Sequence, residues 1–257
     1  MQFLISGKAD LLFLLIGGGQ LYFTDEYISL LPGYSNVACH KHPMLHIIAS
    51  EEMIKAKILG RSICTRQLII ARNIKHEIVH LPFKTIVLFV APYSSLEKEL
   101  NRLLEGQNFY PSEELIPDFA GDEKCLTEKV LDYWGLQANN VQLADDQRVR
   151  VIIEKFSNGE WLSDRVSGIA EKNHISVSRL EHVFKNETGI TLKQYMLMSR
   201  LRNVYRLAIK GISLTEAALA SGFNSSAHLS KMAHDMTGIS ISHVLEGIKK
   251  QQIFESR

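Results

Sequence analysis

A pattern that occurs twice, about 45 residues apart, constrains the fold of this chain more than any other feature. Residues 162–185 and 207–234 each place small residues in a first helix, then a turn, then a second helix that opens with serine. In the first copy Ser176 is the expected N-cap, because a serine hydroxyl can accept a hydrogen bond from a free backbone N–H of the first turn. The repeat predicts two helix-turn-helix units in tandem, a motif whose second helix enters the DNA major groove.

The residues around these units form a longer, collinear pattern from about Val149 to Val244. Its first half consists of Ser178-Arg179-Leu180, Val183-Phe184-Lys185, Glu187-Thr188-Gly189-Ile190, Tyr195 and Arg200-Leu201. Its second half consists of Ile212-Ser213, Glu216-Ala217-Ala218, Gly222-Phe223, His228-Leu229-Ser230-Lys231 and Gly238-Ile239-Ser240. This pattern resembles the AraC/XylS family of bacterial transcription regulators. The chain departs from it near the end, where an aromatic residue, several basic residues and a proline are replaced by Ala233, His234-Asp235-Met236 and Ile241.

The charges are distributed unevenly along the chain. Residues 1–146 hold 13 Lys and Arg against 18 Asp and Glu, a net charge of −5, whereas residues 147–257 hold 16 against 10, a net charge of +6. A basic region beside an acidic one predicts that only the C-terminal part meets a polyanion. Double-stranded DNA is therefore the partner that we expect for this part.

The cysteines and the apolar runs bear on the compartment. Cys39, Cys64 and Cys125 are few, odd in number and widely spaced, which fits neither a disulfide framework nor a zinc site. The apolar run 11–16 is too short to span a bilayer, and residues 1–5 lack the basic start of a signal peptide. We expect a cytoplasmic protein that has no membrane partner.

The N-terminal part reads as a set of short strands. Apolar or alternating runs at 11–16, 20–23, 44–49, 56–59, 68–71 and 86–90 are separated by turn residues such as Gly17-Gly18-Gly19, Gly60 and Pro82. Short strands with turns between them predict a sandwich or a barrel. The period then changes, and 94–104 and 126–136 read as helices, with a Pro-containing connector at 106–121 and a linker that begins at Asn139.

The strand region also resembles the small cupin-like barrel of many AraC-type regulators. The fold class that we predict is α+β: a cupin-like β-barrel with linker helices, followed by an all-α tandem helix-turn-helix domain. The predicted limits are 1–93 for the barrel, which would sense a ligand or hold a dimer, 94–144 for the helical linker and dimerisation segment, and 145–257 for the DNA-binding domain.

Histidines gather in the barrel region. His40, His42 and His46 would share one face of a strand, where the side-chain period is two, and His76 follows about 30 residues later. Metal-binding cupins use a His-x-His pair with a carboxylate and a further histidine; here Glu51, Glu52 or Glu77 and His76 or His80 would supply them. Because no carboxylate stands in an obvious register, we predict no metal and no cofactor. The four histidines are instead the candidate ligand pocket, with ordinary packing as the alternative.

The DNA-facing residues follow from the helical period. In the first recognition helix Ser178, Arg179, Glu181 and His182 face outward and are the predicted base readers, with a local Glu181–Lys185 pair as the alternative. In the second helix the corresponding residues are Ser226, Ala227, Ser230 and Lys231. Lys185, Lys193 and Ser225 are the predicted phosphate contacts, together with Lys231, which position the protein without specifying sequence.

The helix predicted over 192–209 would join the two units as a rigid linker. A DNA-binding transcription regulator that is not an enzyme is the function we predict, with a small-molecule effector, a second copy of the chain in a homodimer and RNA polymerase as further partners. The alternative is a cupin-type metal-binding protein or enzyme with an appended DNA-binding module.

Overall fold

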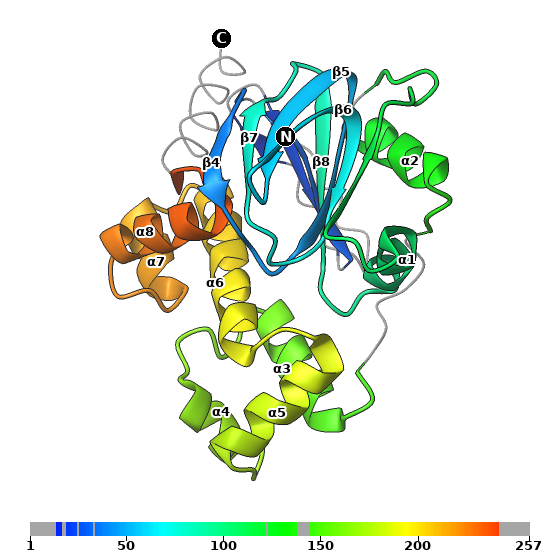
Figure 1. The fold of residues 1–257 in the computed structure, drawn as a ribbon. Helices are drawn as coiled ribbons and strands as arrows, with labels where there is room; N and C mark the ends of the chain where they lie inside the picture. Colours follow the sequence, from blue (N-terminus) through cyan, green and yellow to red (C-terminus); the bar gives the residue numbers. More distant parts are fainter. Residues whose placement is uncertain are drawn as a thin grey trace. The chain divides into compact units, whose positions relative to one another are not determined.

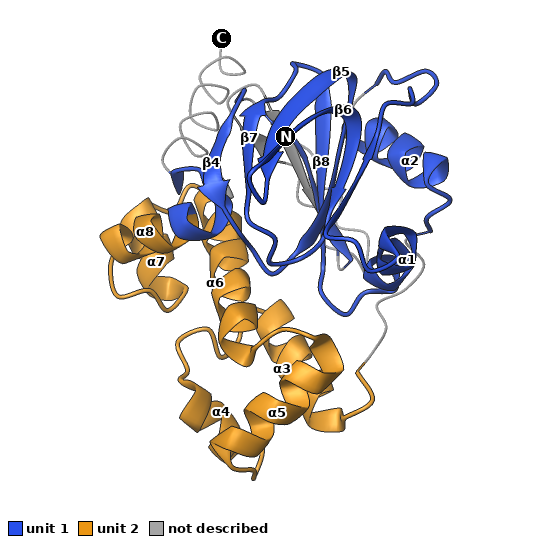
Figure 2. Ribbon diagram, in the orientation of Figure 1, with its two compact units in different colours: residues 1–141, 234–257 blue, residues 142–233 orange. Residues whose placement is uncertain are grey.

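The computed structural model describes residues 14–16, 19–24, 26–32, 34–121, 123–137 and 144–241 (Figure 1). The chain divides into two compact units, residues 1–141 with 234–257, and residues 142–233 (Figure 2). The first unit is built on an antiparallel sheet, and the second consists of helices. The predicted α+β organisation is confirmed.

The described part of the sheet contains nine strands, all paired antiparallel. They are β1 (Leu14–Ile16), β2 (Gly19–Phe23), β3 (Tyr27–Leu31), β4 (Val37–His40), β5 (Leu45–Ile58), β6 (Arg61–Ile70), β7 (His76–His80), β8 (Thr85–Val90) and β9 (Phe109–Ser112). The order is β1-β2-β3-β8-β5-β6-β9, while β7 pairs with both β4 and β5. This topology brings β4, β5 and β7, which carry three of the four candidate pocket histidines, to one part of the sheet.

Strand β5 is long and has two different neighbours on one side. Its first half pairs with β8, with Leu45 opposite Val90, and its second half pairs with β7, with Ile58 opposite His76. Its register against β6 shifts between Ala49 and Ile54. The prediction of separate strands at 44–49 and 56–59 was wrong. The charged residues between them are exposed, and the ladder with β6 continues on both sides of the irregularity, so the two runs form one strand.

Two helices of the first unit complete its core. Helix α1 (Ser95–Leu104) follows the N-cap Ser94, whose side chain accepts a hydrogen bond from the Glu97 N–H, and helix α2 spans Glu123–Tyr133. Both apolar stripes pack into the same buried cluster as the sheet, through Leu96, Leu100, Leu104, Leu126, Val130 and Leu131. These stripes pack inside the unit, and dimerisation through the segment 94–144 stays a prediction.

The helical unit begins with α3 (Gln147–Ser157), α4 (Val166–Lys172) and α5 (Val177–Thr188), and continues with α6 (Leu192–Ile209), α7 (Leu214–Ala220) and α8 (Ser226–Thr237). The division between the units falls within α8, after Ala233. The bounds of α6 confirm the predicted helix. Its N-cap Thr191 forms a reciprocal capping box with Gln194, which satisfies two backbone donors at the start of the helix.

Several sequence predictions concern residues that the structure leaves undescribed. Residues 1–5, 11–13, the turn residues Gly17 and Gly18, and the linker start at 139–140 lie outside the described residues. Within the described residues, none of the three cysteines forms a disulfide, and no helix combines the length and the apolar character that a bilayer crossing requires.

Candidate functional site

The second helices of the two helix-turn-helix motifs, α5 and α8, begin with the same cap. The Ser176 hydroxyl accepts a hydrogen bond from the Arg179 N–H at 3.3 Å, and the Ser225 hydroxyl accepts one from the His228 N–H at 3.1 Å. The two serines are 49 residues apart. Capping in this way fixes where each helix starts, and therefore which side chains of its first turns face outward.

The second helices also end alike. Thr188 and Thr237, again 49 residues apart, each accept from the backbone N–H two residues on, at 3.4 and 3.3 Å. The residue after each threonine is glycine, Gly189 with a φ of 72° and Gly238 with a φ of 70°, a left-handed conformation that ends a helix at little cost for glycine. The sequence repeat is thus a repeat of local structure.

One face of α5 is buried. Leu180, Val183 and Phe184 lie in the core of the unit, and α5 contacts α4, α3 and α6. In α8 the residues at the same places in the repeat, Leu229 and Ala233, are buried too. The periodicity of these apolar residues therefore leaves the opposite face of each helix for polar side chains.

That opposite face of α5 carries the predicted base readers. Ser178, Arg179 and His182 are exposed, and Glu181 is half-buried. The Asn186 side-chain amide donates to Nε2 of His182 at 3.0 Å. Glu181 does not pair with Lys185, the local alternative; it pairs with Lys193, whose Nζ lies 3.5 Å from Oε1 of Glu181.

The matching face of α8 is built from smaller side chains. Ala227 and Lys231 are exposed, whereas Ser226 and Ser230 are half-buried. Ser225 is exposed as well as being the N-cap, so its hydroxyl hydrogen remains able to donate to a phosphate oxygen while its oxygen accepts from His228. The role of each of these residues toward DNA stays a prediction.

Helix α6 is fastened to the rest of its unit by long polar side chains. Arg200 donates to the backbone carbonyls of Leu162 and Asp164 at 2.7 and 3.1 Å, and Arg206 donates to the Ser157 carbonyl at 3.2 Å. Burial lowers the pKa of Arg200, but guanidinium remains charged at any physiological pH. These bonds join the linker helix to the loop that follows α3.

The turn between α7 and α8, in the second helix-turn-helix motif, contacts the same loop. The Asn203 amide donates to the Ser221 hydroxyl at 3.0 Å, and a Cβ built on Gly222, whose φ is +80°, would lie 2.3 Å from the Leu162 carbonyl oxygen. Only glycine fits this approach. Sequence reasoning missed Arg200, Asn203 and Gly222 as positioning residues, because their partners are 18 to 60 residues away.

The four candidate pocket histidines come together in the sheet unit. His40 ends β4, His42 lies in the β4–β5 connection, His46 lies on β5 and His76 begins β7. Their ring centroids are 4.2 to 5.4 Å apart for the five pairs in contact, and no ring is more than 8% exposed. Their convergence does not come from one strand face, as predicted, but from the pairing of β4 and β7, in which His40 stands opposite His76.

The surroundings keep these rings neutral. Burial, and next the charge of His76, lower the pKa of His40 to about 4. Burial followed by the neighbouring histidines also holds the pKa values of His42 and His46 well below 6.5, and burial lowers that of His76. The Met44 backbone raises the pKa of His42, but this effect is smaller than those of burial and of the neighbouring histidines. A neutral imidazole presents a lone pair on one ring nitrogen.

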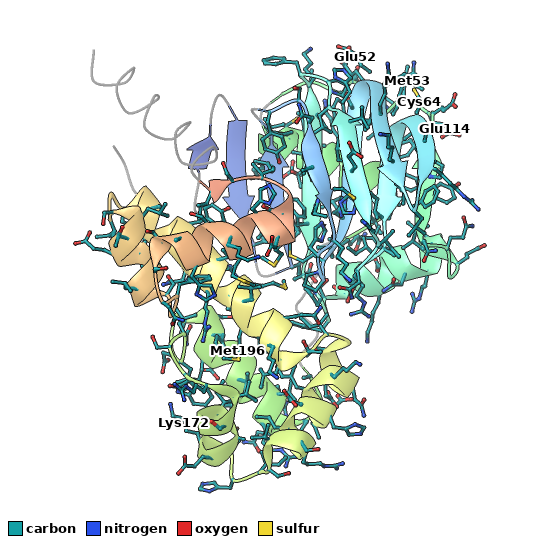
Figure 3. All side chains as sticks on the ribbon, turned by 60° about the vertical axis from the view of Figure 1, so that its left-hand side comes forward. Glu52, Met53, Cys64, Glu114, Lys172 and Met196 are labelled. Atoms are coloured by element: carbon teal, nitrogen blue, oxygen red, sulfur yellow. The ribbon has the colours of Figure 1, made fainter. Side chains whose placement is uncertain are left out.

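The carboxylates that we had considered beside these histidines lie elsewhere. Glu51 and Glu52 are exposed, and Glu51 pairs with Lys84 at 3.7 Å. Figure 3 shows Glu52 beside Met53, Cys64 and Glu114 at one end of the sheet. Glu77 pairs with Lys57 at 3.8 Å, and His80 is exposed on β7. Among the described residues the histidine cluster therefore has no carboxylate.

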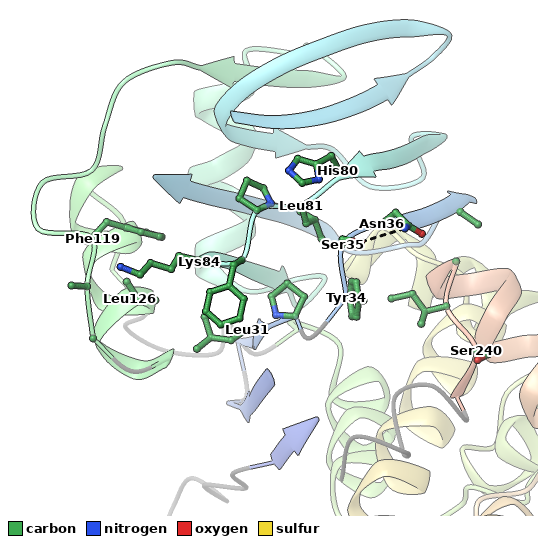
Figure 4. A pocket seen from close by; sticks show the side chains of 18 of the residues that line it. Leu31, Tyr34, Ser35, Asn36, His80, Leu81, Lys84, Phe119, Leu126 and Ser240 are labelled. Carbon is green, nitrogen blue, oxygen red and sulfur yellow. Dashed lines mark hydrogen bonds between the residues drawn. The ribbon is translucent and has the colours of Figure 1, made fainter. Parts of the chain in front are cut away.

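A separate open pocket of about 1110 Å³ lies in the same unit (Figure 4). Its lining comes from the β3–β4 and β7–β8 connections with the strand ends beside them, from residues 119–121 and 126, and from residues 234 and 238–240. Most of the wall is apolar, with Leu31, Leu81 and Phe119 among the lining residues, and Lys84 and His80 provide polar groups. Its volume suits a small molecule, but the four buried histidines do not line it.

Comparison with known proteins agrees with this architecture. Residues 169–247 match the helix-turn-helix domain family HTH_18. The structure of apo ToxT from Vibrio cholerae, in a variant form, is similar over 90% of this chain and 97% of that chain, with 12% identity and a TM-score of 0.51. No curated protein matches the sequence.

Two further solved structures are similar to parts of the chain. The DNA-binding domain of AdpA, solved with a target DNA, matches 42% of this chain and 98% of that chain with 19% identity and a TM-score of 0.37. An RmlC-like cupin from Shewanella frigidimarina matches 35% of this chain and 91% of that chain with 13% identity and a TM-score of 0.25. The C-terminal part of this chain contains a helix-turn-helix domain, and a region built on an antiparallel sheet precedes it.

Proposed function

We propose that this protein is a sequence-specific DNA-binding transcription regulator whose helices α5 and α8 read adjacent major grooves. The observation that carries the proposal is the repeated unit: two capped helices, 49 residues apart, each with a buried apolar face and an outward polar face. In a helix-turn-helix the N-terminal residues of the second helix contact base edges. The base readers would be Ser178, Arg179, Glu181 and His182 in α5, and Ser226, Ala227 and Ser230 in α8. Lys231 occupies the same outward face of α8 and would contact chiefly the phosphate backbone.

Helix α6 sets the distance between these two readers. Its 18 residues span about 27 Å, which is comparable with the roughly 34 Å of one turn of DNA. The hydrogen bonds of Arg200, Asn203 and Arg206 support a stiff connection between the two helix-turn-helix motifs. A stiff connection of this length favours contact with successive major grooves on one face of the duplex.

The test is a selection of bound fragments by the full-length protein from random genomic duplexes at low salt. We expect a recurring sequence of two half-sites about one helical turn apart, and an affinity that falls steeply with added salt as Lys and Arg contacts release counterions. The matched variant replaces Arg179 and Glu181 by alanine, which removes an exposed and a half-buried side chain without changing the buried face of α5. Failure to enrich any sequence, or equal enrichment by the variant, would contradict the proposal.

The sheet unit is then the sensory part, and we infer that the open pocket beside His80 and Lys84 takes a small apolar effector. The structure of ToxT has been solved with an unsaturated fatty acid bound. For this chain the support is the apolar lining and the size of the pocket. Apolar carboxylic acids should change the DNA affinity of the full-length protein, while polar metabolites of equal size should leave it unchanged.

A homodimer, with RNA polymerase as a further partner, completes this proposal. Two copies would present four recognition helices to a repeated operator and raise the avidity without any new contact. Light scattering of the full-length protein at micromolar concentration decides this part. A monomer under those conditions, with or without operator DNA, would leave a monomeric regulator. We assign no catalytic role to the cupin-like unit.

A further inference from the structure

We propose that His228 is a further DNA contact of the second helix-turn-helix motif, and that its ring donates a hydrogen bond from Nε2 to an acceptor on the operator. This inference rests on the proposed function, because it adds a residue to the reading surface of α8. His228 was absent from the contacts that the helical period predicted for this helix.

The structural repeat places His228 on the reading surface. The N-caps Ser176 and Ser225 are 49 residues apart, and both accept from the backbone N–H three residues on. The same offset of 49 pairs His228 with Arg179, a predicted base reader of α5. Both residues lie in the first turn of a second helix, which is the part that contacts base edges in helix-turn-helix proteins.

His228 takes part in two hydrogen bonds at the start of α8. Its backbone N–H donates to the Ser225 hydroxyl at 3.1 Å, and its ring Nδ1 accepts from the Asn224 N–H at 3.4 Å. Because a backbone N–H can only donate, Nδ1 carries a lone pair, and the proton of the neutral ring is on Nε2. The imidazole therefore acts like the Glu or Gln of a capping box, whose side chain reaches back to a backbone N–H before the helix.

The ring is held in place while its second nitrogen stays available. The His228 ring lies 5.6 Å from that of the buried Phe223, with 73° between their planes, so aromatic packing supports the bond to Asn224. Nε2 of His228 forms no hydrogen bond within the described residues and is not among their buried unpaired atoms, so it faces solvent. A donor that is fixed before binding loses little conformational entropy when it meets its acceptor.

The corresponding residue of α5 offers a different kind of donor. Arg179 has no acceptor atom in its side chain, so it cannot close a cap of this kind, and it is exposed. A guanidinium can bond to O6 and N7 of one guanine together, whereas the single Nε2–H of His228 reaches one acceptor. The acceptor is a purine N7 in the major groove or a phosphate oxygen, and the experiment distinguishes these two sources.

Two substitutions separate the cap from the DNA contact. His228→Glu keeps an acceptor for the Asn224 N–H but removes the donor and adds a negative charge, whereas His228→Gln keeps both an acceptor and a donor. We expect the thermal unfolding midpoints of both full-length variants to stay within about 2 °C of the original value. On the duplex that the full-length protein selects, His228→Glu should bind at least about 30-fold more weakly, and His228→Gln within about 5-fold of the original.

The matched control is Gln147→Glu. It makes the same change of charge at an exposed residue of α3, outside both helix-turn-helix motifs. Because salt screens exposed charges that are far from the duplex, its affinity should stay within about 3-fold of the original. A loss as large as that of His228→Glu would show that the added charge alone weakens binding, and would overturn the proposal.

Modified duplexes identify the acceptor. Single 7-deazapurines remove N7, and single methylphosphonate linkages remove a charged phosphate oxygen, at each position of the second half-site. One such substitution should weaken binding of the original protein about 10-fold and leave the affinity of His228→Glu unchanged, because that variant has already lost the bond. A 7-deazapurine with this behaviour shows base reading, and a methylphosphonate shows a backbone contact. A series in which no substitution behaves this way would overturn the proposal.

Nitrogen-15 NMR of the original protein gives a measurement that needs no variant. The His228 ring should carry its proton on Nε2, and that proton should become protected from exchange when the selected duplex is added. A proton on Nδ1, no gain in protection, or a folded His228→Glu protein that binds as tightly as the original would each overturn the contact while leaving the proposed function intact. If the original protein selects no sequence at all, the proposed function fails as well.

Discussion

The Nζ atom of Lys193 lies 3.5 Å from Oε1 of Glu181, so a predicted phosphate contact and a predicted base reader are paired with each other in this structure. Both side chains are accessible, with 75% of Lys193 and 39% of Glu181 exposed. Ion pairs of this exposure contribute at most about 1 kcal/mol to stability, because water and salt screen them. Each residue can therefore leave the other for DNA at small cost.

Replacing Glu181 by alanine should change base preference and leave stability nearly unchanged. A carboxylate that accepts from a cytosine amino group discriminates by about 1–3 kcal/mol at one base pair. Comparison of binding to all single-base variants of the selected site measures this change, and the thermal unfolding midpoint measures stability. A uniform loss of affinity across every sequence would show that Glu181 does not read a base.

Replacing Lys231 by alanine should weaken binding more evenly. Lys231 is exposed on α8, and its neighbours on the outward face are small. We therefore expect its ammonium group to contact the phosphate backbone, which positions the protein without reading a base. We expect a lower affinity for all sequences and a salt slope smaller by about 1. The prediction is wrong if the variant instead loses its preference at one base pair and keeps the salt slope.

Replacing Gly222 by alanine should destabilise the helical unit by at least about 2 kcal/mol, since the new methyl group meets the Leu162 carbonyl oxygen and the backbone keeps a φ of +80°. Gly211→Ala is the matched control: its φ is +83°, and no atom lies within 4 Å of the added carbon. It should therefore lose only the conformational part, about 1 kcal/mol. Chemical denaturation of both variants gives the two free energies, and equal losses would refute the close approach.

The buried histidines should make the sheet unit sensitive to acid. The pKa of His40 is about 4 and those of the other three are also lowered, whereas an unfolded histidine titrates near 6.5. Below pH 6.5 the unfolded chain therefore binds more protons than the folded one, and the free energy of unfolding falls as the pH falls toward 4.

Chemical denaturation of the full-length protein at pH 7, 6 and 5 tests this expectation. The matched variants are His46→Leu, which removes one buried titrating ring, and His80→Gln, which removes an exposed one. His46→Leu should flatten the pH dependence and His80→Gln should leave it as it was. An original protein of constant stability over this range would contradict the assignment of neutral buried rings.

The helical unit could be predicted closely because its signals are local. Thr191 and Ser176 mark helix starts by their own hydrogen bonds, and glycine marks the end at Gly189. The pairing of Glu181 with Lys193 was not predictable, because it joins two helices across the turn at Gly189 and depends on how α5 and α6 pack.

The sheet unit was harder to predict, because strand partners are set by distant segments. Strands β3, β7 and β9 were missed, and β9 lies in a stretch that reads as a connector. The histidine residues of the cluster were predicted, but their convergence depends on the pairing of β4 with β7, which no periodicity within one strand reveals.

The fastening of α6 to the loop after α3 has a consequence for the nucleic acid. If the distance between the two reading helices is fixed by Arg200 and its carbonyl partners, the protein cannot adjust to an operator of altered spacing. Inserting one base pair between half-sites rotates one of them by about 34–36° around the duplex axis. The duplex must then absorb the mismatch by twisting or bending, at a free energy that depends on the stiffness of the intervening steps. Flexible pyrimidine–purine steps in a spacer that no side chain touches would then become part of the recognised sequence.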